Sequence, residues 1–241
     1  MPLYPNYPII MRNYFNDFRN KYIGGVMANK NAVHQRYYTK DGELVAGSTT
    51  ILSVMAKPNL IRWAWNCGIK GEDYTKVRDS AGSVGTITHL MITEELQNRV
   101  PDLKDFTQNN IDSATLCLNS FHEWRKSHTL EVIHVEKPLI SEIYRYGGTP
   151  DFLGLVNGEL ELMDFKTSNG IWNDYYYQLA SYRQLEIENG YNIETARILR
   201  FSKGDNVEFE DRLIKQFKYE FETFTHCLAI YNLLKTMKRQ L

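Results

Sequence analysis

The chain has 241 residues, a hydrophobic fraction of 43%, a charged fraction of 24% and a formal net charge of -1. These values exclude a disordered chain, because they are ordinary for globular proteins and the length allows a sizeable core. A nearly neutral chain has no overall attraction for a polyanion, so any binding of nucleic acid must rely on a local basic patch or on metal ions.

The cysteines and the N-terminal segment indicate the compartment. The three cysteines, Cys67, Cys117 and Cys227, lie far apart and form no CxxC pair, so we expect buried free thiols in a reducing compartment rather than disulfides or a structural zinc site. The segment "MPLYPNYPIIMRNYF" lacks the pattern of a signal peptide, and no run reaches the roughly 18 apolar residues of a membrane span. We therefore expect a cytoplasmic protein with no membrane partner.

The first half of the chain reads mainly as helices. "RYYTKDGELV" predicts a small hairpin around Asp41, and "GSTTILSVMAKPNLIRWAWNCG" predicts a capped helix interrupted near Pro58. In "SAGSVGTITHLMITEEL" small residues lead into an amphipathic helix, and "NIDSATLCLNSFHEWRKSH" continues as a helix to Lys126. Both helices should pack on a sheet.

The second half reads as strands between helices. "EVIHVEKPL" alternates as a strand that places Val132, His134 and Glu136 on one face, and a hairpin follows it. A helix is predicted from Asn173 to Glu188, then a hairpin in "TARILRFSKGDNVEFE". This order predicts an α/β fold, a central mixed β-sheet flanked by helices. We expect a single domain over residues 1–241, with 1–45 an N-terminal extension and 211–241 a C-terminal helix.

The hairpin in "GGTPDFLGLVNGELELMDFKTS" carries the chemistry. The Asn157 and Gly158 pair between two β-prone runs is a strong signal for a two-residue hairpin loop. In that register Val156 faces Glu159, and continuing outward Asp151 meets Asp164. Like charges directly opposed on one sheet face destabilise each other unless a positive group lies between them. A divalent cation would supply that charge.

Lys166 completes the pattern. Side chains alternate along a strand, so Lys166 should emerge on the same face as Asp164 while Phe165 points away. A β-bulge would shift the register by one residue and scatter the set. The alternative interpretation is a surface hairpin in which Lys166 bridges two ordinary acids, since Asp-x-Lys is common by chance.

Five motifs in order now form a recognisable set: "GTITH", "VEKPL", "GGTPDFLG", "MDFKTS" and "YYYQLASYR". The set resembles the PD-(D/E)xK nuclease superfamily, and within it the RecB-like, phage-type exonucleases that include the mitochondrial genome-maintenance exonuclease. The resemblance covers about 100 residues and leaves the first and last forty uncovered. It implies a restriction-endonuclease-like αβββαβ core.

The resemblance implies a role for each matching residue. Asp151 and Asp164 would hold Mg²⁺ or Mn²⁺ with help from the Phe165 backbone carbonyl, and Lys166 would be the catalytic lysine that orients or helps deprotonate water and stabilises the developing charge. His89 in "GTITH" would be a further metal ligand, although a lone helical histidine is usually a packed core residue. Glu136 would lie near the metal, unless it is a strand-end surface carboxylate.

Two further residues match a motif for contact with the nucleic-acid backbone. Gln178 and Tyr182 lie one helical turn apart on the same face, and the resemblance implies that they donate hydrogen bonds to phosphates. The structural alternative is that Tyr175, Leu179 and Tyr182 form the core stripe of the helix. Relatives with an iron–sulfur cluster carry four cysteines, so we expect no iron–sulfur cluster here.

The resulting hypothesis is a metal-dependent deoxyribonuclease, an exonuclease acting on single-stranded or frayed DNA ends in phage-type recombination, replication or repair. An annealing protein or a helicase is a possible partner class. Basic side chains such as Arg62 could guide the strand, or could belong to an ordinary solvated face. Two alternatives stay open: a noncatalytic DNA-binding module of the same fold, and a restriction-type endonuclease.

Overall fold

The computed structural model describes residues 35–202 and 208–238. Within these ranges a central five-stranded sheet has the order β3-β6-β7-β8-β9. Its strands are β3 (Leu130–Val135), β6 (Phe152–Val156), β7 (Glu159–Thr167), β8 (Thr195–Phe201) and β9 (Phe209–Ile214). The pair of β7 and β8 is parallel and the other pairs are antiparallel, which confirms the predicted mixed sheet.

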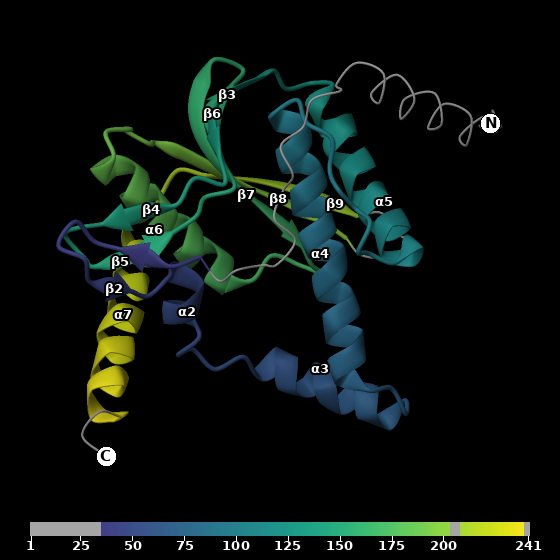
Figure 1. Cartoon of the computed structure of the whole chain (residues 1–241), viewed down its shortest axis with the longest axis horizontal. Coiled ribbons are helices and arrows are strands. Elements are labelled where there is room, and N and C mark those ends of the chain that lie inside the picture. The colour runs from purple at the N-terminus through teal and green to yellow at the C-terminus, as the bar shows by residue number, and fades with distance from the viewer. Residues whose placement is uncertain (1–34, 203–207, 239–241) are drawn as a thin grey trace.

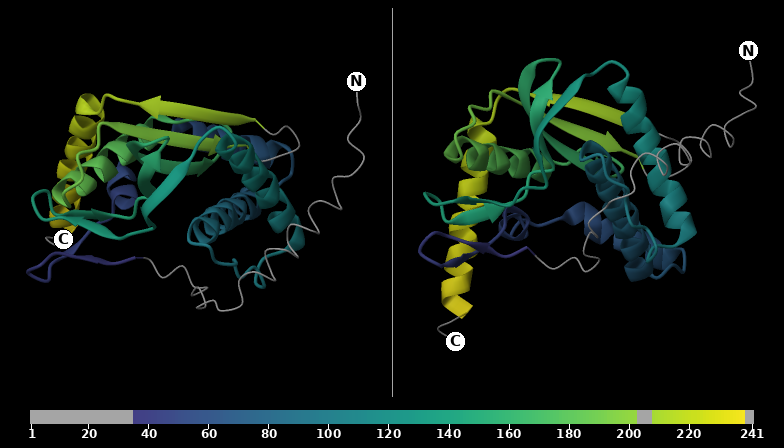
Figure 2. Two further views of the ribbon diagram at one scale, coloured as in Figure 1. Left: turned by 90° about the horizontal axis from the view of Figure 1, so that it is seen from above. Right: turned by 45° about the horizontal axis from the view of Figure 1, so that its top comes forward.

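Helices cover both faces of this sheet (Figures 1 and 2). The helices are α2 (Ser48–Leu52), α3 (Pro58–Ile69), α4 (Tyr74–Leu96), α5 (Gln108–Arg125), α6 (Asn173–Glu188) and α7 (Lys218–Lys238). Two short hairpins, β1 (Tyr37–Tyr38) with β2 (Leu44–Val45) and β4 (Leu139–Ser141) with β5 (Tyr146–Gly148), lie outside the central sheet.

The alternation of side chains on the strands creates a separate core on each face. On β7, Leu162 packs in the cluster that contains α6 and α7, whereas Met163 and Phe165 pack against residues of α4 and α5. On β8 the same rule sends Ile198 to the first cluster and Leu199 to the second. Asp164 therefore belongs to the α6 side of the sheet, and its neighbour Phe165 to the α4 side.

The central hairpin has the predicted register. Asn157 and Gly158 adopt φ angles of 52° and 87°, the left-handed conformations that a type I′ turn requires. Val156 pairs with Glu159, and the ladder continues to Phe152 with Met163. The predicted pairing of Asp151 with Asp164 lies one step beyond the end of this ladder.

Three predicted boundaries are wrong. The C-terminal helix begins at Lys218 rather than at Asp211, because residues 209–214 pair with β8 as β9. The small residues near Gly82 are inside α4, which begins at Tyr74 where the Asp73 carboxylate accepts the Thr75 N–H at 2.9 Å. The predicted strand through "EVIHVEKPL" ends at Val135, and the hairpin of β4 and β5 was not foreseen because each strand has three residues.

Residues 1–34 of the expected N-terminal extension lie outside the described residues. The described part of that extension contacts the body of the protein. The Tyr37 ring lies where a Cβ on Gly147 would sit, and the Gly147 N–H donates to the carbonyl of Ala46, directly after the extension, at 2.9 Å. This N-terminal hairpin is therefore packed against β5.

A substitution at Gly154 on β6 tests how closely β3 and β6 approach each other. A Cβ there would lie 2.2 Å from the Glu131 carbonyl oxygen and 2.5 Å from the Phe152 ring. We expect Gly154→Ala to lower the free energy of unfolding by about 1–3 kcal/mol, because backbone must move to admit the methyl group. Chemical denaturation measures this change.

Gly82→Ala is the matched control. No atom outside its own helix lies within 4 Å of the Cβ that Gly82 lacks, so alanine should leave stability unchanged or raise it by up to about 1 kcal/mol. Equal effects of the two substitutions would contradict the packing described for Gly154.

Candidate metal centre

Three potential metal ligands converge where β6 begins. The nearest ligand atoms of His89, Glu136 and Asp151 all lie within 4.8 Å of one another. His89 Nδ1 is 3.4 Å from Asp151 Oδ1 and 3.8 Å from Glu136 Oε1. The three residues come from α4, from the turn after β3 and from the residue before β6. The fold thus gathers residues 47 and 62 positions apart at one point.

Asp164 and Lys166 lie beside this group on β7. Asp164 is 1% exposed, and Lys166 Nζ lies 2.5 Å from its Oδ2. Apart from this ion pair, neither carboxylate oxygen of Asp164 has a hydrogen-bond donor among the described residues. The structure therefore places Asp164 and Lys166 on one face, as the alternation predicted, but Asp164 is outside the 4.8 Å group.

The two aspartates are linked through the backbone of β7. The Phe165 N–H donates to Asp151 Oδ2 at 2.6 Å, so the Asp151 carboxylate is held against the strand that carries Asp164. The Phe165 side chain points away and is fully buried against Phe121. That its carbonyl binds a metal stays a prediction.

Glu136 reaches the site through an unusual backbone conformation. Its φ is 48°, a left-handed value that is uncommon outside glycine, asparagine and aspartate. Its N–H donates to the Asp151 carbonyl at 3.2 Å, and a register shift between Val132 and His134 precedes it. The prediction that Glu136 shares a strand face with Val132 and His134 is therefore wrong, although its proximity to the other acids is as expected.

His89 reaches the acids because α4 approaches the end of β7 closely. A Cβ on Gly85, one turn before His89, would lie 2.7 Å from Thr167 Oγ1. Glycine at this position lets the helix lie against the strand, and the His89 ring also contacts the Phe165 ring edge-on at 6.1 Å. The Gly in "GTITH" thus has a packing role.

Charge coupling sets the protonation of the site. Burial raises the pKa of Asp164, with Asp151 adding to the shift and Lys166 opposing it, to about 6. Burial would lower the pKa of His89, but Asp151 and Glu136 outweigh it and raise that pKa to about 10. Burial would likewise lower the pKa of Lys166, but the two aspartates raise it, so its ammonium is charged at neutral pH.

A divalent cation fits the residues present. Carboxylate oxygens suit Mg²⁺ or Mn²⁺, and a buried carboxylate with unfilled acceptor positions requires a positive partner. His89, Glu136 and Asp151 bring their ligand atoms within 4.8 Å of one another, and the buried carboxylate of Asp164 lies beside this group. Burial also raises the pKa of Glu136, with Asp151 adding to the shift. A bound cation would relieve this repulsion among acids.

Gln178 and Tyr182 on α6 are hydrogen-bonded to each other. Gln178 Nε2 donates to the Tyr182 hydroxyl at 2.8 Å, and both residues are buried. Burial raises the pKa of Tyr182 well above its usual range, and the charges of Asp164 and Asp151 add to the shift. The structure thus places this phenol in the field of the acids, while its ring and Leu179 belong to the core as the alternative held.

Two aromatic residues near the site were not predicted to be there. The Tyr37 hydroxyl lies 3.0 Å from Thr149 Oγ1, and Thr149 is two residues before Asp151. Burial raises the pKa of Tyr37, and the charge of Glu136 adds to this rise. Tyr175 lies with its ring centroid 5.1 Å from Lys166 Nζ. The sequence offered no motif for Tyr37, because it lies in the part of the chain that the resemblance leaves uncovered.

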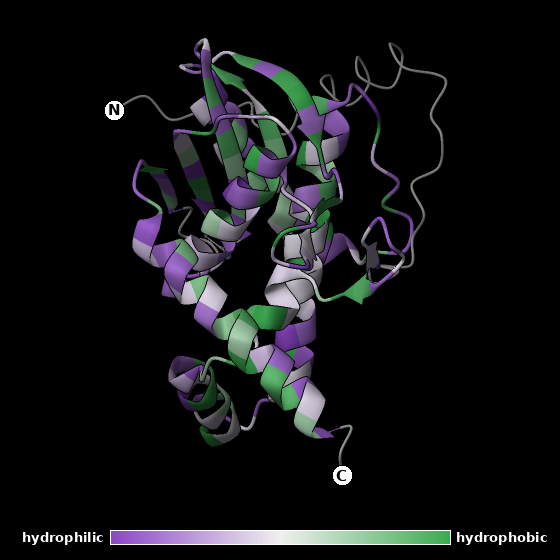
Figure 3. Cartoon of the chain, turned by 90° about the vertical axis from the view of Figure 1, so that its left-hand side faces the viewer, coloured by the Kyte–Doolittle hydropathy of each residue, from purple (hydrophilic) through white to green (hydrophobic). Residues whose placement is uncertain are grey.

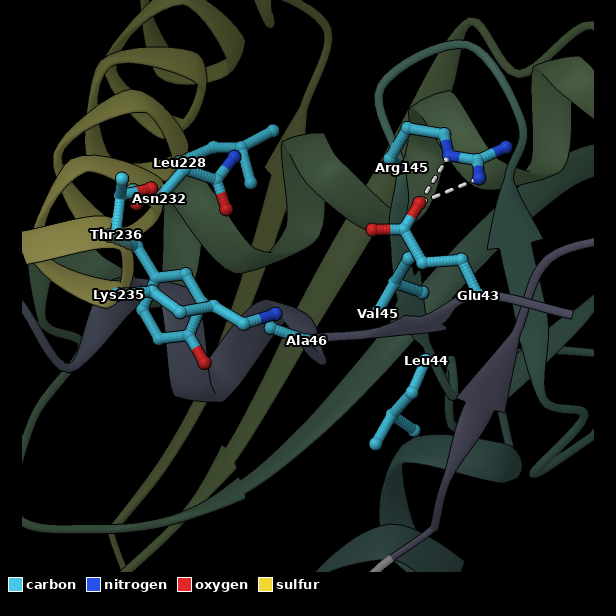
Figure 4. A pocket seen from close by; sticks show the side chains of 10 residues that line it. Glu43, Leu44, Val45, Ala46, Arg145, Leu228, Asn232, Lys235 and Thr236 are labelled. Carbon is cyan, nitrogen blue, oxygen red and sulfur yellow. Dashed lines mark hydrogen bonds and ion pairs between the residues drawn. The ribbon is translucent and has the colours of Figure 1, made fainter. Parts of the chain in front are cut away.

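A cavity of about 300 Å³ lies elsewhere, between the N-terminal hairpin and α7 (Figure 4). Its walls include Glu43, Arg145 and Lys235, and it shares no residue with the metal centre. Arg145 is occupied there by ion pairs with Asp41 and Glu43. This cavity gives no support to the nuclease hypothesis.

No family model and no curated protein matches this sequence. Among solved structures, the chain is similar to a "Putative exonuclease" from Eubacterium rectale, with 10% identity, 66% of this chain and 69% of that chain covered, and a TM-score of 0.45. It is also similar to the alkaline exonuclease LHK-Exo from Laribacter hongkongensis, with 14% identity, 64% and 82% covered, and a TM-score of 0.35. LHK-Exo in complex with dAMP gives 15% identity and a TM-score of 0.36. These neighbours are exonucleases by name, and the activity of this chain has to be argued from its own site.

The pKa shifts predict how Mn²⁺ binding depends on pH. Asp164 becomes ionised as the pH rises through about 6, and His89 carries a proton until about 10, so a bound cation must displace protons. We expect the affinity to rise with pH, by about tenfold per pH unit for each proton released. Calorimetric titration with Mn²⁺ in two buffers of different ionisation enthalpy counts those protons.

The raised pKa of Asp164 also predicts how the stability of the fold depends on pH and on Mn²⁺. The folded pKa of Asp164 lies above its ordinary value, so its contribution to stability is present below about pH 4 and lost as the pH rises through about 6. Mn²⁺ offsets that loss, so the rise in melting temperature on adding Mn²⁺ should be larger at pH 7.5 than at pH 5. In Asp164→Asn this difference should shrink; an unchanged difference would contradict the assignment.

Proposed function

We propose that this chain is a metal-dependent deoxyribonuclease, an exonuclease that hydrolyses single-stranded or frayed DNA ends with Mg²⁺ or Mn²⁺. One observation carries the proposal: the Asp164–Lys166 ion pair on β7 lies beside the converging ligands His89, Glu136 and Asp151. This arrangement supplies acids for a cation and an ammonium for a phosphate in one place. The sequence motifs that match phage-type exonucleases support the same proposal.

The acids and His89 would hold the cation, with the Phe165 carbonyl as a further oxygen. When bound, a divalent cation polarises a phosphoryl oxygen and lowers the pKa of water. The chain's own residues fix where this can happen. The Phe165 N–H orients Asp151, and the left-handed turn at Glu136 directs a third carboxylate toward it.

Lys166 would act mainly through its charge. The raised pKa keeps its ammonium protonated at neutral pH, so it favours stabilisation of the negative charge that develops on the phosphate over removal of a proton from water. The ring of Tyr175 and the Asp164 carboxylate fix its position. Gln178 and Tyr182 would add neutral donors for phosphate oxygens, with their mutual hydrogen bond orienting the pair.

The motifs also suggest a setting for this activity. A phage-type exonuclease would serve recombination, replication or repair in the cytoplasm, together with an annealing protein or a helicase. Among the described residues, no helix has the length and apolar character needed to traverse a lipid bilayer.

Lys166→Ala tests the catalytic role directly. We expect cleavage of end-labelled single-stranded and double-stranded DNA in Mg²⁺ to fall by at least about 100-fold, the usual effect of losing one charge-stabilising group. A chelator should abolish cleavage by the unchanged protein. Lys215→Ala, an exposed lysine after β9, is the control and should cleave normally.

Circular single-stranded DNA separates the alternatives. An exonuclease needs an end, so circles should persist while linear strands are degraded. Cutting of circles would favour the restriction-type endonuclease. Binding without metal-dependent cleavage, equal in the Lys166→Ala protein, would favour the noncatalytic module.

A further inference from the structure

The segment from α3 to the first turns of α4 projects from the body of the protein and is named here the α3 arm (residues 57–80). Between residues 56 and 80 the only buried side chain is that of Cys67. In Figure 1 α3 lies at the far end of α4, below the sheet. A segment this exposed contributes little to the core, so another role must account for its composition.

An apolar stripe runs along the outer side of α3. Ile61, Trp65 and Ile69 are 72%, 70% and 70% exposed. Their spacing of four residues places them on one face, away from the buried Cys67. Figure 3 shows hydrophobic positions interleaved with hydrophilic ones along this helix. Large side chains grouped on an exposed face mark a binding surface.

The arm that carries the stripe also carries exposed basic side chains. Arg62, Lys70 and Lys76 are exposed, and none of them forms an ion pair with another described residue. The arm has five basic and three acidic residues, whereas the whole chain has a net charge of -1. The arm therefore has a net charge of +2, which complements a polyanion.

Gly68 lies on the same helix as Trp65, three residues after it. It lies inside α3, where glycine weakens a helix relative to alanine, and nothing outside the helix lies within 4 Å of its missing Cβ. Packing therefore does not require glycine here. A Cβ at this position would also lie more than 4 Å from every atom of the Trp65 side chain. No side chain at position 68 covers the indole of Trp65, a residue that is 70% exposed.

The arm is joined rigidly to the metal centre. Helix α4 runs without interruption from Tyr74 to Leu96 and carries His89. Fifteen residues of helix separate Tyr74 from His89, a rise of about 22 Å. A strand that reaches both places must extend several nucleotides beyond the bond held at the metal centre.

We propose that the α3 arm binds single-stranded nucleic acid, with a base stacked on Trp65 and phosphates contacted by Arg62, Lys70 and Lys76. Aromatic stacking combined with basic side chains is the way proteins grip unpaired strands without reading sequence. The inference rests on the proposed function only in taking the bound strand to be the substrate. It gives Arg62 a role in binding the strand rather than a place on an ordinary solvated face.

Equilibrium binding in a chelating buffer, where no cleavage occurs, tests the proposal. Fluorescein-labelled oligothymidylate of about 20 nucleotides, longer than one typical site of 4–16 nucleotides, is titrated with each protein. Trp65→Ala should bind at least about fivefold more weakly. Gly68→Ala should bind as the unchanged protein does while its melting temperature rises, since alanine favours the helix and its methyl group would lie more than 4 Å from the indole.

Leu233→Ala is the matched control, because Leu233 is 65% exposed on α7 and lies on a different projection. It should bind as the unchanged protein does. Wild-type affinity in Trp65→Ala would overturn the proposal. So would sedimentation showing a dimer that Trp65→Ala dissociates, since a second copy would then cover the stripe.

The metal centre is tested separately with bis(p-nitrophenyl) phosphate, which is too small to reach the arm. Failure of the unchanged protein to hydrolyse it in Mn²⁺ would count against the nuclease assignment alone. Oligothymidylate binding that depends on Trp65 would still support the arm as a binding surface. The two proposals can therefore fail independently.

Discussion

The crowding of carboxylates at the end of one β-hairpin is the constraint on which the site depends. Asp151 and Asp164 are both buried, and Glu136 lies beside them. In a medium of low polarity such charges cannot persist together unless they are paired or hold a cation. Lys166 and His89 supply the positive charge within the chain, and a divalent cation would supply more.

Several features of the backbone hold these groups close together. The left-handed turn at Glu136, the missing side chain of Gly85 and the hydrogen bond from the Phe165 N–H each bring one group closer to the others. Strain and close approach concentrated at one point are typical of functional sites.

The hairpin and the pattern along β7 were predictable from the sequence because they depend on local rules. A type I′ turn at Asn157 and Gly158 fixes the register, and the register together with strand alternation puts Asp164 and Lys166 on one face. The span of α6 followed from the helical pattern of its own segment. The mixed sheet followed from the order of strands and helices along the chain. The predicted boundaries were wrong where pairing with another strand decides them. Asp211 is in a strand because β8 lies beside it, although its own segment has a helical pattern.

The sequence by itself determined the hairpin of β6 and β7, the alternation of side chains along β7 and the resemblance of the motifs to a nuclease, because all three depend on short stretches. Only the tertiary structure decided that His89 reaches Asp151, that Glu136 turns inward, and that Tyr37 and Tyr175 stand beside the site. The physical reason is that these contacts join residues on different elements, up to 112 positions apart for Tyr37 and Thr149, through tertiary packing. No periodicity within one segment specifies which segment will lie against it.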